Sequence, residues 1–144
     1  MIVQLLFIGA LLLQAFSHGV ASAALINDVR QAEGRPAVPL RSWLLPSLSI
    51  KAAAAIASVF WILATVGFLA AALSFTGALL PADVWRQFTV AASVVSTLGI
   101  VLFSGIWPGA PNRKLSQIDT VVALVINVVL LVAVTAGYPY ISSV

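Results

Sequence analysis

The chain has 144 residues, of which 62% are hydrophobic and 8% are charged, and its formal net charge is +3 at pH 7. A soluble domain usually carries about a quarter of charged residues, so this chain has too little polar surface for a water-soluble fold. The absence of cysteine excludes disulfides, thiol redox chemistry and cysteine-ligated metals.

The first apolar run covers residues 2–26 and is long enough to cross a bilayer as a helix. Its LLFIGALLL segment followed by VASAA also resembles a signal peptide, but no Lys or Arg precedes it, so we expect a retained helix. Gln14 and His18 lie one helical turn apart. They are therefore expected to face protein rather than lipid.

Residues 27–48 hold much of the charge and several Gly and Pro residues, which predicts an irregular connection on the membrane surface. Trp43 beside Arg41 is typical of an interfacial anchor. The second span is expected over residues 49–75, because no charged residue occurs between Lys51 and Asp83. Ser58 and Thr65 repeat at a seven-residue interval in this span, which predicts a helix-packing seam.

The third span is expected over residues 81–105, with Pro81 in its first turn. Trp85 at its start is a further predicted interface anchor. Ser93 and Ser96 lie on one stripe of small hydroxyl residues, which favours helix packing. Trp61, inside the second span, either fills space between helices or lines a ligand pocket.

The loop GIWPGAPNRK contains three predicted interface anchors, Trp107, Arg113 and Lys114. SQID at residues 116–119 has the form of a capping box, so a fourth span is expected over residues 117–137. Asn127 shares a face with Thr120 and is expected to point into the bundle.

These elements predict an all-α integral membrane protein, with four transmembrane helices in an antiparallel bundle and a single domain over residues 1–144. One side of the membrane carries most of the basic residues, namely Arg30, Arg35, Arg41, Lys51, Arg113 and Lys114, and the other side carries Arg86. The positive-inside rule therefore predicts that connections 27–48 and 106–116 are cytoplasmic and that both termini are outside.

Asp28, Glu33, Asp83 and Asp119 are all expected in connections or at span ends, and the sequence has no recognisable catalytic motif. We therefore expect a protein that is not an enzyme. His18 has two possible roles. It could ligate a haem or chlorophyll-type pigment, or it could hydrogen-bond Gln14 or Asn127 across the bundle.

The last 80 residues or so, from FWILATVGFLAAALSF through PADVWRQFTVAASVVSTLGIVLF to IDTVVALVINVVLLVA, resemble small uncharacterised bacterial multi-span membrane proteins. The resemblance is mostly one of hydropathy, and it implies the bacterial cytoplasmic membrane without implying an activity.

Three hypotheses follow for function. The first is a non-catalytic subunit that packs against other integral membrane subunits in a respiratory, photosynthetic or transport complex, with lipids and no nucleic acid as further partners. The second is a tetrapyrrole-carrying subunit that uses His18. The third is a small homo-oligomeric transporter or channel with a path lined by Gln14, His18, Thr120 and Asn127.

Overall fold

The computed structural model describes residues 2–30, 42–103 and 107–136. The described residues form four helices and no strand: α1 (Ile2–Arg30), α2 (Ile50–Phe75), α3 (Trp85–Leu102) and α4 (Arg113–Thr135). Each helix is long and apolar enough to cross a membrane. The expected all-α fold with four membrane-length helices is confirmed.

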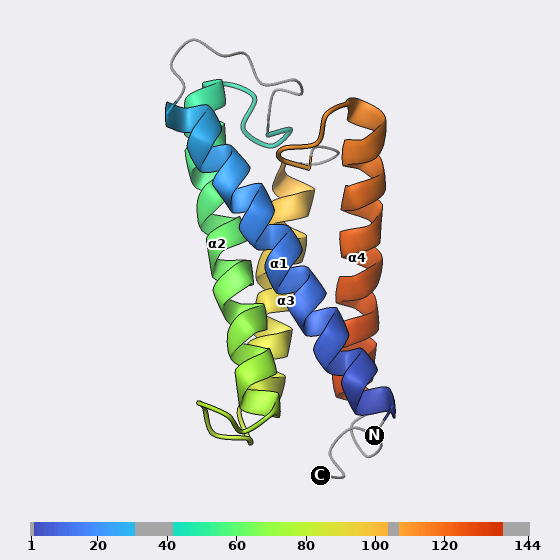
Figure 1. The fold of residues 1–144 in the computed structure, drawn as a ribbon. Helices are drawn as coiled ribbons and strands as arrows, with labels where there is room; N and C mark the ends of the chain where they lie inside the picture. The colour runs from blue at the N-terminus through green and yellow to red at the C-terminus, as the bar shows by residue number, and fades with distance from the viewer. Residues whose placement is uncertain (1, 31–41, 104–106, 137–144) are drawn as a thin grey trace.

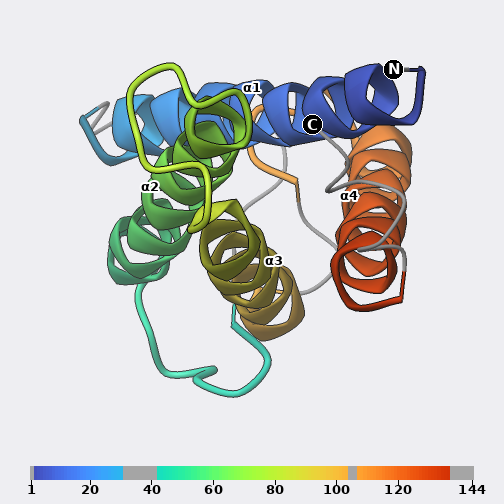
Figure 2. The same cartoon turned by 90° about the horizontal axis from the view of Figure 1, so that it is seen from below.

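Successive helices run in opposite directions and pack as neighbours, α1 on α2, α2 on α3 and α3 on α4 (Figure 1). The contact between α1 and α4, which would close the bundle, is small, because these two helices touch over only a short length. Figure 1 shows α1 crossing the face of the bundle at an angle, and Figure 2 shows α1 lying across one side of the other three helices. The two helices diverge toward the end where α4 begins.

Buried side chains recur at alternating intervals of three and four residues on every described helix. They include Phe7, Leu11, Gln14, His18, Ala21 and Leu25 on α1, Ala57, Trp61, Ala64, Phe68 and Ala71 on α2, Trp85, Thr89, Ala92, Ser96 and Gly99 on α3, and Ser116, Thr120, Ala123, Asn127, Leu130 and Val134 on α4. An average spacing of about 3.5 residues is that of left-handed bundles. One continuous stripe per helix therefore supplies much of the interior.

Glycines allow α2 and α3 to approach closely. A Cβ atom added at Gly67 would lie 2.8 Å from the Cβ of Ala92, and one added at Gly99 would lie 2.9 Å from the Cβ of Phe60. In lipid, helix association depends on this kind of close packing, because apolar burial gives no advantage over contact with lipid tails. The α2–α3 contact is therefore specified by small residues.

The ends of α2 agree with the sequence. The hydroxyl of Ser49 caps α2 by accepting the backbone N–H of Ala52 at 3.2 Å. After Phe75 the chain turns at Gly77, whose φ of +65° is in the left-handed region that glycine tolerates best. The helix therefore ends at Phe75, the predicted end of the second span.

The starts of α3 and α4 differ from the prediction. Pro81 precedes α3 rather than lying in its first turn, because residues 81–84 form a turn in which the Pro81 carbonyl accepts the backbone N–H of Val84. Helix α4 begins at Arg113, before the SQID segment. Its cap is Asn112, whose Oδ1 accepts the backbone N–H of Leu115 at 3.0 Å. Residues 105 and 137, the predicted ends of two spans, lie outside the described residues.

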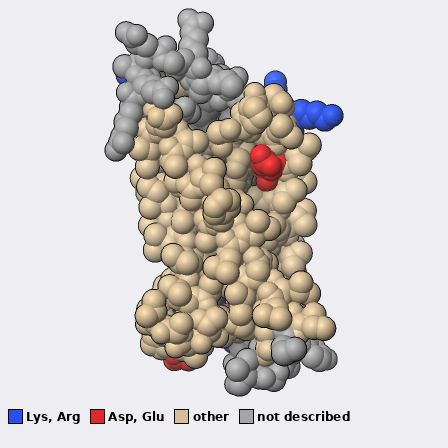
Figure 3. Space-filling model, in the orientation of Figure 1, with Lys and Arg blue, Asp and Glu red and all other residues tan. Residues whose placement is uncertain are grey.

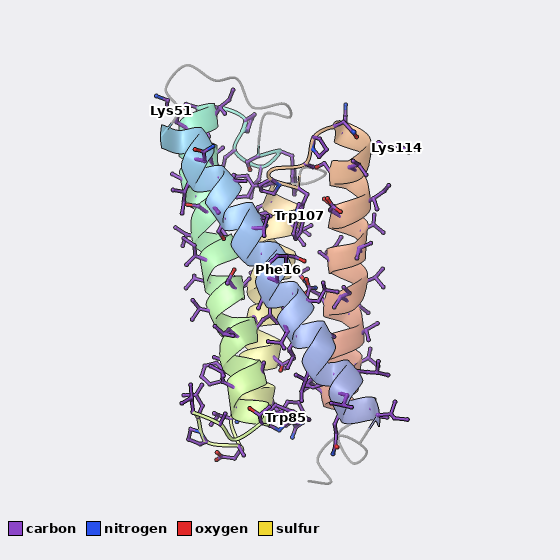
Figure 4. The ribbon with its side chains drawn as sticks, viewed as in Figure 1. Phe16, Lys51, Trp85, Trp107 and Lys114 are labelled. Carbon is purple, nitrogen blue, oxygen red and sulfur yellow. The ribbon has the colours of Figure 1, made fainter. Side chains whose placement is uncertain are left out.

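The described basic side chains lie at the two ends of the bundle. Lys51 and Lys114 are at the same end (Figure 4), and the long side in Figure 3 is almost free of charge. Arg86, in the first turn of α3, is at the other end, where its Nη2 donates to the Val134 carbonyl at 3.4 Å. A belt with little charge therefore separates two polar ends.

Candidate functional site

Four side chains from three helices meet in the interior and form what we call the polar ring: Gln14 and His18 of α1, Ser96 of α3 and Asn127 of α4. Each of the four is at most 3% exposed. The Gln14 Nε2 donates to Asn127 Oδ1 at 2.9 Å, and Asn127 Nδ2 donates to Ser96 Oγ at 2.8 Å. His18 Nε2 lies 2.7 Å from Ser96 Oγ, and His18 Nδ1 lies 2.8 Å from the backbone oxygen of Gln14.

Two backbone carbonyls determine where every proton of the polar ring lies. Gln14 Nε2 also reaches the Ala123 carbonyl at 2.9 Å, which fixes the orientation of the Gln14 amide and then that of Asn127. The Gln14 carbonyl can only accept, so His18 carries its proton on Nδ1. His18 Nε2 then accepts from the Ser96 hydroxyl. The ring is a closed chain in which each member donates to the next.

Three aromatic side chains lie near the His18 ring. Its ring centroid lies 5.6 Å from that of Phe68, 6.4 Å from that of Trp61 and 5.2 Å from that of Trp107. Trp61 is 1% exposed, and its indole N–H has no partner among the described residues. Trp61 therefore fills space between helices, one of the two roles that its sequence position allowed.

The geometry of His18 does not favour metal ligation. Both ring nitrogens are in hydrogen bonds, so a metal on Nε2 would have to displace the Ser96 hydroxyl inside the bundle. The described residues also contain no group of three or more His, Cys, Asp or Glu side chains that could hold a metal ion without a tetrapyrrole. Gln14 and Asn127 join the ring, but Thr120 bonds the Ser116 carbonyl of its own helix at 2.8 Å and lies apart from it.

The remaining predicted packing residues have mixed surroundings. Ser58 and Thr65 bond carbonyls of their own helix, Ala55 and Trp61 respectively, and are partly buried. Ser93 is fully buried without a hydrogen-bond partner in the described part of the chain. Only Ser96, among these hydroxyl residues, bonds side chains of other helices.

The three predicted tryptophan anchors differ in exposure. Trp43 is 61% exposed and donates to the Val101 carbonyl near the end of α3. Trp85 is buried against Phe7 and Phe75, at centroid distances of 5.3 and 5.2 Å. Trp85 and Trp107 are thus buried in the bundle, and their position at the headgroups stays a prediction. Arg113 and Lys114 are exposed at the start of α4, whereas Arg41 lies outside the described residues.

The loop before α4 explains the burial of Trp107. Gly109, with φ of +78°, lies so close to α1 that a Cβ added there would be 2.9 Å from the Cβ of Ala24. The Ser116 hydroxyl also accepts the backbone N–H of Trp107. The loop is thus held inward, and Trp107 lies between α1 and α4 (Figure 4).

A groove of about 250 Å³ opens where α1 and α4 diverge. It is lined by Leu13, Gln14, Phe16, Ser17 and Val20 of α1, by Trp107, and by Asp119, Val122, Ala123 and Ile126 of α4. Sequence reasoning missed Asp119, because the predicted cap at Ser116 placed it at the helix start. Asp119 in fact follows the first turn of α4, one turn before Ala123 on the same side of the helix.

The four apolar helices and their interior define the class of this protein as a multi-span, α-helical membrane protein. Comparison of the chain with protein-family models, curated proteins and solved structures gives no match.

Proposed function

We propose that the protein is a non-catalytic integral membrane subunit that packs against other membrane proteins in a larger complex. The polar ring is the observation that supports this proposal. Its hydrogen bonds connect α1, α3 and α4 to one another, so its polar groups serve to hold the bundle together. In such a protein the outer faces of the helices are the surfaces that bind the partner proteins.

The outward face of α1 has the profile of a helix-packing surface. Gly9, Phe16 and Ala23 recur every seven residues and are exposed, and no other side chain lies within 4 Å of a Cβ added at Gly9. Phe16 is 72% exposed between these two small residues. A partner helix could approach closely at the small residues and pack around the aromatic ring.

For localisation we propose the cytoplasmic membrane of a bacterium, which the resemblance of the last 80 residues or so supports. Lys51, Arg113 and Lys114 gather at one end, and the positive-inside rule assigns that end to the cytoplasm. Both termini would then lie outside.

The proposal is tested by the mass of the particle extracted from its native membrane in a mild detergent. We expect a particle with other integral proteins in constant ratio to this chain. Because the chain has no cysteine, Gly9→Cys provides a single cross-linking site, and Ala55→Cys on the exposed face of α2 is the matched control. Particles that contain this chain alone, with no cross-link from Gly9→Cys, would contradict the proposal.

The second candidate is a small homo-oligomeric transporter, which the groove containing Asp119 favours, because carboxylates within membrane helices often mark transport paths. Reconstituted vesicles should then show a flux of small cations that is lost in Asp119→Asn. Equal leakage in the two proteins would remove this candidate.

A further inference from the structure

The polar residues of the α1–α4 groove lie at two neighbouring levels. The Gln14 amide meets α4 at the Ala123 carbonyl. Because the two helices are antiparallel, Ser17 on α1 and Asp119 on α4 each lie about one turn from that contact, toward the end where α4 begins. Ser17 and Asp119 therefore belong to opposite walls of the groove at a similar level.

Three oxygen acceptors in this groove have no partner among the described residues. The Asp119 carboxylate forms no ion pair or hydrogen bond there, and the Ser17 hydroxyl forms none either. Gln14 uses its amide nitrogen for both of its side-chain bonds, which leaves its Oε1 available. The groove therefore presents one negative charge and two neutral acceptors.

Asp119 lies where a carboxylate without a hydrogen-bond or ion-pair partner is energetically costly. It lies six positions after Arg113, which is ~9 Å along the helix axis. Exposed apolar side chains flank it, including Ile118 at 47% and Val122 at 49%. Figure 3 shows acidic atoms set within uncharged surface on this side of the molecule. A carboxylate among membrane-facing residues is costly unless a cation or donors neutralise it.

We propose that the α1–α4 groove binds a primary ammonium group carried on an apolar chain. An ammonium of this kind has one positive charge and three N–H donors, which match Asp119, Ser17 and the Gln14 oxygen. Leu13, Phe16, Val20 and Ile126 supply apolar walls for the chain, and Trp107 supplies an aromatic ring. A volume of about 250 Å³ accommodates such a group but not a whole helix.

Two kinds of ligand carry a primary ammonium group on an apolar chain. One is a free alkylamine dissolved in the membrane, and the other is the ethanolamine headgroup of a phospholipid. Both present the same –NH₃⁺ group, whereas a trimethylammonium group has the same charge without any N–H donor. An anionic amphiphile would be repelled by Asp119.

The first test is titration of the purified chain, in a neutral detergent, with dodecylammonium followed by calorimetry. We expect Asp119→Asn to weaken binding by about tenfold or more, since a hydrogen bond to a charged group contributes roughly 1.5–3 kcal/mol. The matched control is Asp83→Asn, which changes an exposed acidic residue outside the groove and should leave the affinity unchanged. Dodecyltrimethylammonium should bind wild type about tenfold more weakly than dodecylammonium.

Equal affinity in wild type and Asp119→Asn, or equal affinity for the two cations, would overturn the proposal. Should Asp119→Asn fail to give a helical bundle by circular dichroism, Ser17→Val replaces it as the test. That variant must weaken dodecylammonium binding at least about threefold, because it removes one of three acceptors, and an unchanged affinity would likewise overturn the proposal.

A second experiment distinguishes the free alkylamine from the ethanolamine lipid. It uses native mass spectrometry of protein extracted from bilayers of phosphatidylethanolamine or phosphatidylcholine. Retention of the ethanolamine lipid by wild type, with its loss in Asp119→Asn, assigns the site to the lipid headgroup. Asp119-dependent binding of dodecylammonium without selective lipid retention assigns it to a free amine. Both measurements use the isolated chain, so they are independent of whether a protein partner exists in the native membrane.

Discussion

Ser93 and Ser96 lie almost one turn apart on α3, and the same substitution should affect them in opposite ways. Both are buried, but Ser96 bonds His18 and Asn127, whereas Ser93 has no partner among the described residues. A buried polar group without a partner is destabilising, and a satisfied one is costly to remove. We therefore expect Ser96→Ala to lower the free energy of unfolding by about 1 kcal/mol and Ser93→Ala to leave it unchanged or raise it.

The measurement is reversible unfolding of the bundle in mixed micelles by increasing sodium dodecyl sulfate, followed by circular dichroism. Each variant serves as the control for the other, because both delete one hydroxyl from the same helix. Equal destabilisation by the two substitutions would show that the polar ring makes no special contribution at Ser96.

Asn127 connects α4 to both other helices of the polar ring. Its side chain bonds Gln14 on α1 and both Ser96 and Thr97 on α3. Interhelical hydrogen bonds in membrane proteins average about 0.6 kcal/mol each, so Asn127→Leu should cost roughly 1–3 kcal/mol in the same unfolding assay.

The variant Asn127→Asp should be more damaging than Asn127→Leu, because it removes the two donors and also places a carboxylate in the interior. Thr135→Val is the control, since the Thr135 hydroxyl is exposed and bonds its own helix. An Asn127→Asp variant as stable as Asn127→Leu would contradict the donor assignment in the ring.

The inward-facing polar residues were predictable from helical periodicity alone. Gln14 and His18 share a face one turn apart, and Asn127 follows the buried Thr120 at a seven-residue interval. The bond from His18 to Ser96 was not predictable, because a single sequence contains no local signal for which helices are neighbours. The orientation of the Gln14 amide also depends on another helix, because its nitrogen donates to the Ala123 carbonyl of α4.

Close contact between α2 and α3 makes them sensitive to side-chain volume. Gly67→Ala introduces a methyl group 2.8 Å from the Cβ of Ala92, so the two helices must move apart. Overpacking of this kind typically costs about 1–3 kcal/mol, more than the ~1 kcal/mol gained from the higher helix propensity of alanine. We expect Gly67→Ala to lower the midpoint of detergent unfolding.

The same substitution at Gly9 is the control, because a Cβ there meets nothing within 4 Å. Gly9→Ala should be neutral or slightly stabilising. A Gly67→Ala variant that is as stable as Gly9→Ala would show that α2 and α3 separate without cost.

Helix ends were harder to predict than helix existence, because neighbouring residues compete to form a cap. Both Asn112 and Ser116 are suitable N-cap residues, and the sequence SQID favours Ser116. In the structure Asn112 caps α4, and the Ser116 hydroxyl bonds the backbone of Trp107. A contact between a loop and a helix therefore decided the start of α4, and this start moved Asp119 out of the first turn.

The four-helix architecture could be predicted from hydropathy, because each span had to be long enough to cross the bilayer and satisfy its own backbone. The divergence of α1 from α4 could not be predicted in this way. It follows from the angle at which α1 crosses the other helices (Figure 1), and no residue pattern within α1 alone sets that angle. The groove is a consequence of this tertiary arrangement.

The orientation proposed for the molecule is tested by labelling single cysteines with a membrane-impermeant reagent. Pro111→Cys lies in the loop before α4 and Leu79→Cys in the turn between α2 and α3, and both positions are exposed. We expect Pro111→Cys to react only from the cytoplasm and Leu79→Cys only from outside. The opposite pattern would invert the topology, and the cysteine-free parent chain reports background.

The polar ring joins α1, α3 and α4 and leaves out α2, whose described side chains make no hydrogen bond to another helix. Because apolar surfaces have no preference for one another over lipid tails, α2 is held by the fit of its alanines, glycines and aromatic rings. Lipid acyl chains therefore compete directly with α2 for its place in the bundle.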